Sequence, residues 1–325
     1  MPPVLLGEGA ELGPGAEFDR IRGVARLLGS RAAGLGDDCA LIQIGDDFLA
    51  VSTDISVEAV HFRLDWIRLE EAGWRATAGA LSDLAAVGAE PTGILSAVTM
   101  PRAAAEAELL ELMAGVGAAA AFARAPVVGG DLSSAEAWSA AITVLGRTHS
   151  PVTRAGAKPG DRLWVTGALG GARSALEAWH RGEQPSSESR VRFAHPEPRL
   201  DAGQWLARHG AHAMIDLSDG IGGDAGHIAA ASHAKLEIDL ASLPVATDVR
   251  AEARRLDMSP GQFAAEGGED YELFVALPPA FAAADQFTRQ CGLALTPIGS
   301  VEAGSGVRFF LDGKPIALKG YNHFG

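Results

Sequence analysis

Six short acidic motifs, each containing glycine or serine, are spread along the sequence. They are Gly36-Asp37-Asp38, Ser52-Thr53-Asp54, Leu81-Ser82-Asp83, Gly129-Gly130-Asp131, Asp216-Leu217-Ser218-Asp219-Gly220 and Gly267-Gly268-Glu269-Asp270. Aspartate is disfavoured inside strands and helices, so each one needs a local reason such as a helix N-cap or a turn. A turn explains Asp46 and Asp47, but Asp83 lies inside an apolar helical pattern. The motifs therefore predict carboxylates gathered at one site, with small neighbours that let a ligand approach the backbone.

Clustered carboxylates cannot all stay ionised without a counter-charge. Hard divalent cations supply one, and Mg²⁺ is typically held by one or two carboxylates together with substrate phosphates. The spacing of Cys and His residues that marks zinc sites is absent, as is the spacing of an EF-hand loop. The acidic motifs therefore predict a site for several Mg²⁺ ions and a phosphate-bearing substrate.

A dinucleotide site is the rival interpretation of one glycine-rich stretch. Residues 220–225 match G-x-G-x-x-A after an expected strand, and Asp239 follows Gly220 by 19 residues. That fingerprint binds pyrophosphate through bare backbone N–H groups, whereas Asp219 and Asp224 would here face it without a metal. No G-x-x-x-x-G-K-[ST] motif occurs, which excludes P-loop chemistry.

Hydrophobic patterning places most of these motifs where strands begin or end, and the motif with Asp83 inside a helix. We expect a hairpin at 40–44 and 48–54, strands at 92–100, 126–130 and 138–146, and helices at 70–87 and 103–123. Alternating strands and helices continue after a turn cluster at 151–161, with an exposed loop at 182–195. This pattern predicts an α+β fold of two mixed α/β domains, covering residues 1–150 and 151–325.

Composition excludes several classes of protein. The chain has 325 residues, 47% hydrophobic and 21% charged, so it can bury a sizeable core. The net charge of −14 argues against nucleic-acid partners and against an anionic membrane surface. No signal-peptide pattern or membrane-length apolar stretch is found, and Cys39 and Cys291 form no disulfide framework. We therefore expect a cytoplasmic protein.

The motifs together resemble those of thiamine-monophosphate kinases, a family of the aminoimidazole-ribonucleotide-synthetase-like superfamily. Further matching stretches are 17–21, 35–40, 60–62, 81–91, 153–161, 267–273 and 320–324, which extend the resemblance over nearly the whole chain. The acidic motifs alone fit several members of the superfamily. The His61-Phe62 pair and the Tyr321 tail point to this family.

The resemblance implies an enzyme that phosphorylates thiamine monophosphate with ATP and several Mg²⁺ ions, with no catalytic base. It implies a homodimer that pairs N-terminal half-barrel sheets, with ATP lying across the sheet and a C-terminal α+β domain completing the site. The implied magnesium ligands are Asp38, Ser52, Thr53, Asp54, Asp83, Asp131, Asp216 and Asp219. The implied ATP contacts are Gly130, Asp131, Arg154 and Ser218, and the implied substrate contacts are His61, Glu269 and Tyr321.

Three other functions remain open from the residues. One is another ATP-using enzyme of the superfamily, similar to aminoimidazole ribonucleotide synthetase or selenophosphate synthetase. The second is a metal-dependent nucleotide-binding protein without catalysis, and the third is the dinucleotide oxidoreductase above. The tryptophans near His61, Trp66 and Trp74, are candidates for stacking on a substrate ring.

Overall fold

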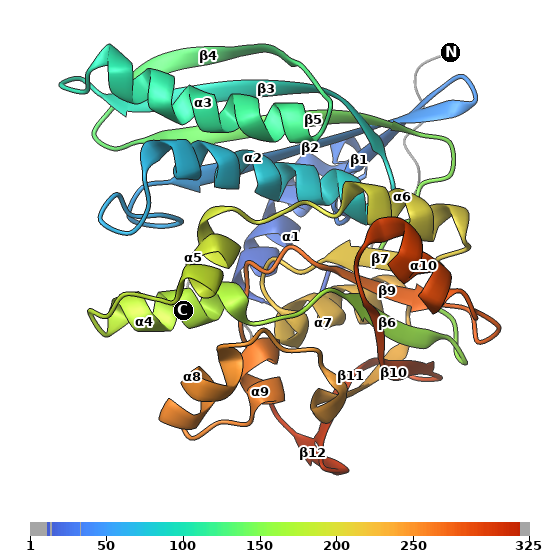
Figure 1. The fold of residues 1–325 in the computed structure, drawn as a ribbon. Coiled ribbons are helices and arrows are strands. Elements are labelled where there is room, and N and C mark those ends of the chain that lie inside the picture. The colour runs from blue at the N-terminus through green and yellow to red at the C-terminus, as the bar shows by residue number, and fades with distance from the viewer. Residues whose placement is uncertain (1–11, 14, 33, 319–325) are drawn as a thin grey trace.

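The computed structural model describes residues 12, 13, 15–32 and 34–318. Figure 1 shows two sheets, one in each half of the chain, with helices between and around them. The N-terminal half contains α1 (Ala16–Leu28), η1 (Gly29–Arg31), β1 (Ala40–Ile44), β2 (Asp47–Val57), α2 (Leu69–Ala86), β3 (Glu90–Pro101), α3 (Glu106–Phe122), β4 (Val127–Ala135) and β5 (Ser139–Thr148).

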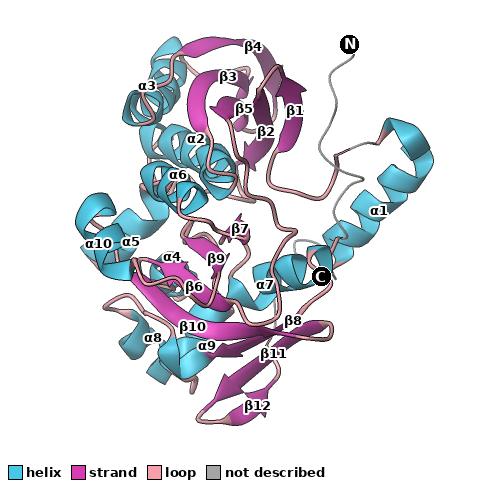
Figure 2. Ribbon diagram, turned by 90° about the vertical axis from the view of Figure 1, so that its right-hand side faces the viewer, coloured by secondary structure: helices cyan, strands magenta, loops and turns pink. Residues whose placement is uncertain are grey.

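The N-terminal sheet has five strands in the order β1-β2-β5-β3-β4. The β1–β2 hairpin pairs Ile44 with Asp47, as the turn residues between them predict, and only the pairing of β3 with β4 is parallel. Helices α2 and α3 cover one face of the sheet, and in Figure 2 the strands curl with none of the described helices on the opposite face. The sheet therefore has one packed face and one open face.

Helix α2 lies between the N-terminal sheet and the C-terminal half (Figure 1). It begins where Glu71 accepts a hydrogen bond from the N–H of Arg68 at 2.8 Å, and it ends before Gly88, whose φ is 68°. A Cβ on Gly88 would lie 2.7 Å from Cβ of Ala207 in the C-terminal half. Gly88 thus both ends the helix and allows the two halves to pack closely.

The C-terminal half forms a mixed sheet of seven strands in the order β12-β11-β8-β10-β6-β9-β7. Its strands are β6 (Arg162–Thr166), β7 (Ala213–Asp216), β8 (Lys235–Asp239), β9 (Leu273–Leu277), β10 (Leu295–Glu302), β11 (Gly306–Leu311) and β12 (Lys314–Ile316). Its helices are α4 (Gly171–His180), α5 (Ser187–Ala194), α6 (Leu200–Arg208), α7 (Ile221–Ala231), η2 (Leu240–Ser242), α8 (Val249–Arg255), α9 (Pro260–Ala265) and α10 (Ala284–Cys291). The predicted α+β class with two mixed α/β halves is confirmed.

Three local predictions were wrong. Ser52-Thr53-Asp54 and Gly129-Gly130-Asp131 lie within β2 and β4, whereas turns or strand ends were expected there. Residues 182–195, expected as an exposed loop, contain α5, which is anchored by the buried Phe193. The polar sequence of α5 hides this because only a few of its side chains face the core.

A continuous apolar cluster joins the two halves. It contains Leu84 and Ile142 from the N-terminal half together with Trp205, Leu206 and Phe287 from the C-terminal half. A second cluster fills the other side of the seven-stranded sheet, around Ile228 and Phe263. The division near residue 150 therefore separates two sheets, while the packing between them is shared.

Candidate active site

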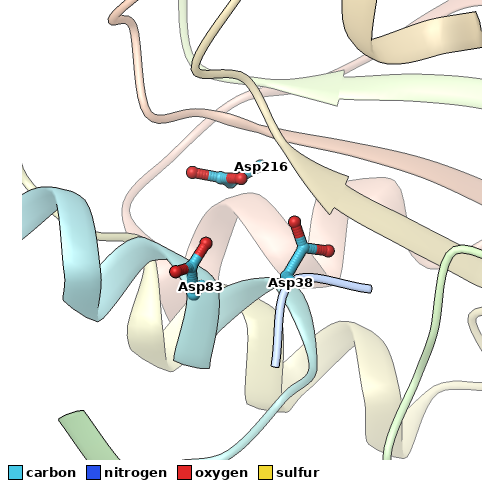
Figure 3. Close-up of side chains that lie close together, drawn as sticks. All are labelled: Asp38, Asp83 and Asp216. Carbon is cyan, nitrogen blue, oxygen red and sulfur yellow. The ribbon is translucent and has the colours of Figure 1, made fainter. Parts of the chain in front are cut away.

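Three aspartates from three distant segments converge between the two sheets. Asp38 precedes β1, Asp83 lies on α2 and Asp216 ends β7, and each offers a carboxylate oxygen within 4.8 Å of the others. Figure 3 shows the three side chains directed toward one another. Burial raises the pKa of Asp83 and of Asp216 well above the ordinary value, and the neighbouring carboxylates raise both further. We call these three residues the aspartate triad.

One guanidinium lies against the aspartate triad. Arg154 Nη2 donates to Asp38 Oδ1 at 2.6 Å, and the backbone N–H of Arg154 donates to Asp37 Oδ2 at 3.1 Å. Burial, followed by the charge of Asp38, raises the pKa of Asp37 to about 7. The second oxygen of Asp38, Oδ2, is buried and has no hydrogen-bond partner among the described residues. The site therefore carries more negative charge than Arg154 can neutralise.

The alternation of side chains along β2 decides which of its polar residues face the aspartate triad. Ser52 donates its hydroxyl hydrogen to Asp83 Oδ2 at 2.5 Å, and the negative charge of Asp54 raises the pKa of Asp83. Thr53 points to the open face of the sheet, where its hydroxyl lies 2.9 Å from that of Thr143 on β5. The structure thus brings Ser52 and Asp54 to the aspartate triad and turns the Thr53 side chain away.

The turn after Asp216 carries two more of the expected residues. Ser218 is exposed, and the N–H of Asp219 donates to Asp224 Oδ2 at 3.2 Å. Asp224 is buried in the first turn of α7, and burial together with Asp219 raises its pKa well above the ordinary value. A carboxylate therefore already occupies the N-terminus of this helix.

The same region excludes the dinucleotide interpretation. The dinucleotide motif needs a strand–helix–strand unit in a parallel sheet. Here β7 is an edge strand antiparallel to β9, and β8, which follows α7, lies four places away in the sheet. A Cβ on Gly220 would lie 2.3 Å from the carbonyl oxygen of Gly267, so this glycine serves a close crossing of two segments.

That crossing joins residues 267–272 to the turn after Asp216. The N–H of Glu269 donates to the carbonyl of Ser218 at 2.7 Å, and the N–H of Tyr271 donates to the carbonyl of Leu217 at 2.9 Å. The side-chain carboxylate of Glu269 forms an ion pair with Arg75 on α2. The expected substrate contact Glu269 is therefore tied directly to the segment that carries Ser218 and Asp219.

Several expected residues lie elsewhere. Gly130 and Asp131 are exposed on β4, and strands β5 and β3 separate β4 from β2. His61 lies in the loop after β2, where its Nδ1 accepts the N–H of Val57 at 3.1 Å. Tyr321 lies outside the described residues.

The tryptophans near His61 are used for packing. Trp66 stacks on Trp179 of α4 with ring centroids 5.2 Å apart, and Trp74 packs against Phe122 and His195. The indole N–H of Trp74 donates to the carbonyl of Pro196 at 2.9 Å. These contacts explain both rings without a substrate.

The donor set fits Mg²⁺. Three carboxylates converge, one of their oxygens is buried and unpartnered among the described residues, and a serine hydroxyl borders them. Oxygen donors of this kind suit a hard divalent cation. The only thiol nearby, Cys39, is buried, and its pKa is raised well above the ordinary value by burial and by Asp83.

Sequence reasoning assigned no role to Asp37 or Arg75. Both had a signal: Asp37 adjoins Asp38 in the quoted motif, and Arg75 is a charge in the same run of small apolar residues that holds Asp83. Arg75 is 3% exposed, so its charge must be paired within the protein.

Among the described residues, none of the helices has the length and apolar character needed to span a membrane.

Comparison with known proteins identifies the family. Residues 36–148 match the family described as AIR synthase related protein, N-terminal domain, and residues 158–312 match its C-terminal domain. The thiamine-monophosphate kinase of Mycobacterium tuberculosis is 36% identical over 276 residues, 83% of each chain. That of Aquifex aeolicus is 33% identical over 312 residues, 95% of this chain and 98% of the relative.

A solved structure of such a protein has the same fold. The structure of AaThiL complexed with AMPPCP and TMP superposes with a TM-score of 0.84 and 32% identity, covering 95% of this chain and 97% of that one. Both the sequence match and the fold match extend over nearly the full length. The chain therefore belongs to the thiamine-monophosphate kinase family of the AIR synthase related proteins.

Proposed function

We propose that this protein transfers the γ-phosphoryl group of ATP to the phosphate of thiamine monophosphate and so forms thiamine diphosphate. The observation that carries this proposal is the aspartate triad with Arg154 beside it. Converging carboxylates need cations to balance their charge, and ATP binds proteins together with Mg²⁺ ions that such carboxylates can hold. The family relatives are thiamine-monophosphate kinases, and the related AaThiL binds AMPPCP and TMP. These observations support ATP and thiamine monophosphate as the two substrates.

Several Mg²⁺ ions are the proposed cofactors. The aspartate triad, with Ser52 and Asp54 beside it, would hold them, and Asp219, Thr53 and Asp131 are further proposed ligands, Thr53 through its backbone. When bound, Mg²⁺ would neutralise charge on the phosphates of two anionic substrates. Asp38 and Asp216 are buried between the two sheets, and Asp83 beside them is partly exposed.

The chain's own residues would bind and orient the substrates. Arg154, Ser218, Gly130 and Asp131 are the proposed ATP contacts, and His61, Glu269 and Tyr321 the proposed acceptor contacts. Because Nδ1 of His61 accepts a backbone N–H, the neutral ring carries its hydrogen on Nε2 and can donate it. The acceptor phosphate has a second pKa of about 6 and is already ionised near pH 7, so transfer needs no base.

We also propose a homodimer formed through the open face of the N-terminal sheet. Ile44, Ile55 and Val128 are exposed in this sheet. Asp131 is in register with Ile55 through β3 and β5, three strand spacings or ~14 Å away. One Mg²⁺ cannot bridge that distance, so Asp131 would bind a different Mg²⁺ ion from those at the aspartate triad. Sedimentation of the wild-type protein and of Val128→Glu would test this pairing.

The proposed division of labour follows the two sheets. Residues 1–150 would bind ATP and metal and form the dimer, and residues 151–325 would complete the site with Arg154, Asp216 and residues 267–272. Use of ATP and the two free cysteines support a cytoplasmic location.

ATP turnover with and without thiamine monophosphate, with the product identified by mass, tests the function. We expect thiamine diphosphate and ADP in equal amounts, and only when Mg²⁺ is present. A panel of other acceptors, including selenide and formylglycinamidine ribonucleotide, separates this activity from those of other superfamily members. Turnover with another acceptor and none with thiamine monophosphate would contradict the proposal.

A further inference from the structure

Among the described residues, the Arg75 side chain makes three contacts, all with the C-terminal half of the chain. Nη1 donates to the carbonyl oxygen of Phe193 at 2.7 Å, the guanidinium lies 3.9 Å from the centre of the Phe193 ring, and Nη2 pairs with Glu269. The Arg75 side chain is 3% exposed, while that of Glu269 is 25% exposed. The pair therefore has a buried cation and a carboxylate that still reaches the surface of the site.

The segment that carries Glu269 has an unusual backbone. Glu269 has a φ of 67° and Tyr271 has a φ of 50°, values that residues other than glycine rarely adopt. Such a conformation persists only where the surrounding contacts hold it. Between these two residues, the Asp270 carboxylate accepts the N–H of Gly170 at 2.8 Å and so ties the segment to the start of α4. The ion pair with Arg75 ties the same segment to α2.

One face of α2 aligns this segment with the aspartate triad. Arg75, Gly79 and Asp83 follow one another at four-residue steps and so lie on one side of the helix. Opposite them, Glu269 pairs with Arg75, the Tyr271 hydroxyl lies 3.3 Å from where a Gly79 Cβ would be, and Asp216 lies beside Asp83. Asp54 Oδ2 is 3.6 Å from that same Gly79 position. Arg75 and Asp83, the latter in the aspartate triad, are thus the two ends of this line of residues on α2.

We propose that Arg75 is a positioning residue for the acceptor: by pairing with Glu269 it fixes that carboxylate at a set distance along α2 from the aspartate triad. The inference rests on the proposed function, since it needs Glu269 to contact thiamine monophosphate. The pairing also sets the character of Glu269. Arg75 already neutralises its charge, so Glu269 meets the acceptor as a hydrogen-bond acceptor through its remaining lone pairs, and it is not a free counter-ion for the thiazolium.

Calorimetric binding of thiamine monophosphate and of AMPPCP to Arg75→Met, Arg75→Lys and Glu269→Gln tests this role. We expect Arg75→Met to weaken thiamine monophosphate binding roughly tenfold, because a charge-assisted hydrogen bond fixing Glu269 is lost. AMPPCP binding should change less than about twofold. Arg75→Lys should recover part of the loss, since lysine restores the charge but cannot also bond the Phe193 carbonyl in the same fork.

Arg190→Met is the matched control. Arg190 of α5 forms a two-pronged ion pair with Glu71 on α2, at 2.6 and 2.7 Å, so it tethers the same elements without touching Glu269. It should lower the unfolding temperature and leave the affinity for thiamine monophosphate unchanged. The double variant Arg75→Met/Glu269→Gln should bind no worse than Glu269→Gln, because Arg75 acts through Glu269.

Equal losses in Arg75→Met and Arg190→Met would overturn the inference, as would additive losses in the double variant. If Arg75→Met does not fold, the same comparison is made with Arg75→Lys, and affinity identical to wild type then overturns it. A wild-type protein that binds AMPPCP but no thiamine monophosphate removes the proposed function, and this inference with it. Wild-type affinity in folded Arg75→Met removes this inference alone.

Discussion

Arg154 donates to Asp38 Oδ1 at 2.6 Å, and through this contact the linker between the two sheets reaches the aspartate triad. The side chain of Arg154 is 13% exposed and that of Asp38 is fully buried. The chain thereby carries one cation of its own into a site built from carboxylates. Asp37, Asp54, Asp83 and Asp216 surround this pair, so the negative charge still exceeds the positive.

Removing this cation should destabilise the metal-free protein. We expect Arg154→Met to lower the free energy of unfolding by about 3 kcal/mol without Mg²⁺, because a buried carboxylate loses its partner. Added Mg²⁺ should recover more stability in the variant than in the wild type. Chemical unfolding with and without Mg²⁺ measures both effects, and Lys158→Met, at an exposed position of the same linker, is the control. An Arg154→Met protein as stable as wild type without metal would contradict this.

Removing a carboxylate should have the opposite effect on the metal-free protein. In Asp83→Asn one source of repulsion disappears, and the amide oxygen can still accept the Ser52 hydroxyl. We expect an unfolding temperature equal to or above that of wild type without Mg²⁺, a smaller increase on adding Mg²⁺, and loss of turnover. Thermal unfolding across a Mg²⁺ titration tests this, with Asp46→Asn in the exposed β1–β2 turn as the control. Wild-type turnover at limiting Mg²⁺ would remove Asp83 from the site.

The sequence was informative where a residue type conflicted with its local pattern. Asp83 in an apolar helix and Asp216 at the end of a buried strand stand out because charges there need a partner. The hairpin at Gly45 was predicted from turn chemistry, whereas the close crossing at Gly220 was not, because its glycine was interpreted as room for a ligand. These local conflicts predicted that carboxylates gather at one site, and the alternation of strands and helices predicted the α+β class.

Other features could not be predicted because they depend on strand order and side-chain facing. The sequence of β4 does not show that two strands separate Asp131 from Asp54, because that separation depends on the order of the strands in the sheet. The Thr53 side chain turns away because alternation along β2 is set by α2 packing on one face. The partner of Glu269, Arg75, lies 194 positions earlier, and no local pattern connects the two.

The buried His227 should make stability depend on pH. Burial, with the positive charge of Arg154 next in effect, lowers its pKa from 6.5 to about 4. Its Nδ1 has no hydrogen-bond partner among the described residues, Phe18 packs on the ring at 4.0 Å, and Asp219 and Arg22 are the other charges that act on it. The unfolded chain takes up this proton at higher pH than the folded one, so this contribution to stability is lost as pH falls from about 6.5 to 4.

We expect the free energy of unfolding attributable to His227 to fall by on the order of 1.4 kcal/mol per pH unit in that window. His227→Phe should flatten this part of the profile, since phenylalanine fills the same space and does not titrate. Urea unfolding at intervals between pH 4 and pH 7 measures it. His233→Phe is a histidine control, two residues beyond the end of the same helix. A profile unchanged by His227→Phe would show that this ring titrates normally.

Phosphoryl transfer should be direct, with no phosphorylated form of the protein. The acceptor phosphate is already ionised near pH 7 and can attack in line once it is held near ATP. One atom of each of three candidate nucleophiles is already bonded within the chain: Asp38 Oδ1 to Arg154, Asp83 Oδ2 to the Ser52 hydroxyl, and Nδ1 of His61 to a backbone N–H. Incubation with γ-³²P-ATP and Mg²⁺ alone should leave the protein unlabelled. With thiamine monophosphate and chiral γ-phosphorothioate ATP, the configuration at phosphorus should invert, as a single displacement requires. Retention would mean two displacements, and a label on the protein would then identify the residue that carries the phosphoryl group.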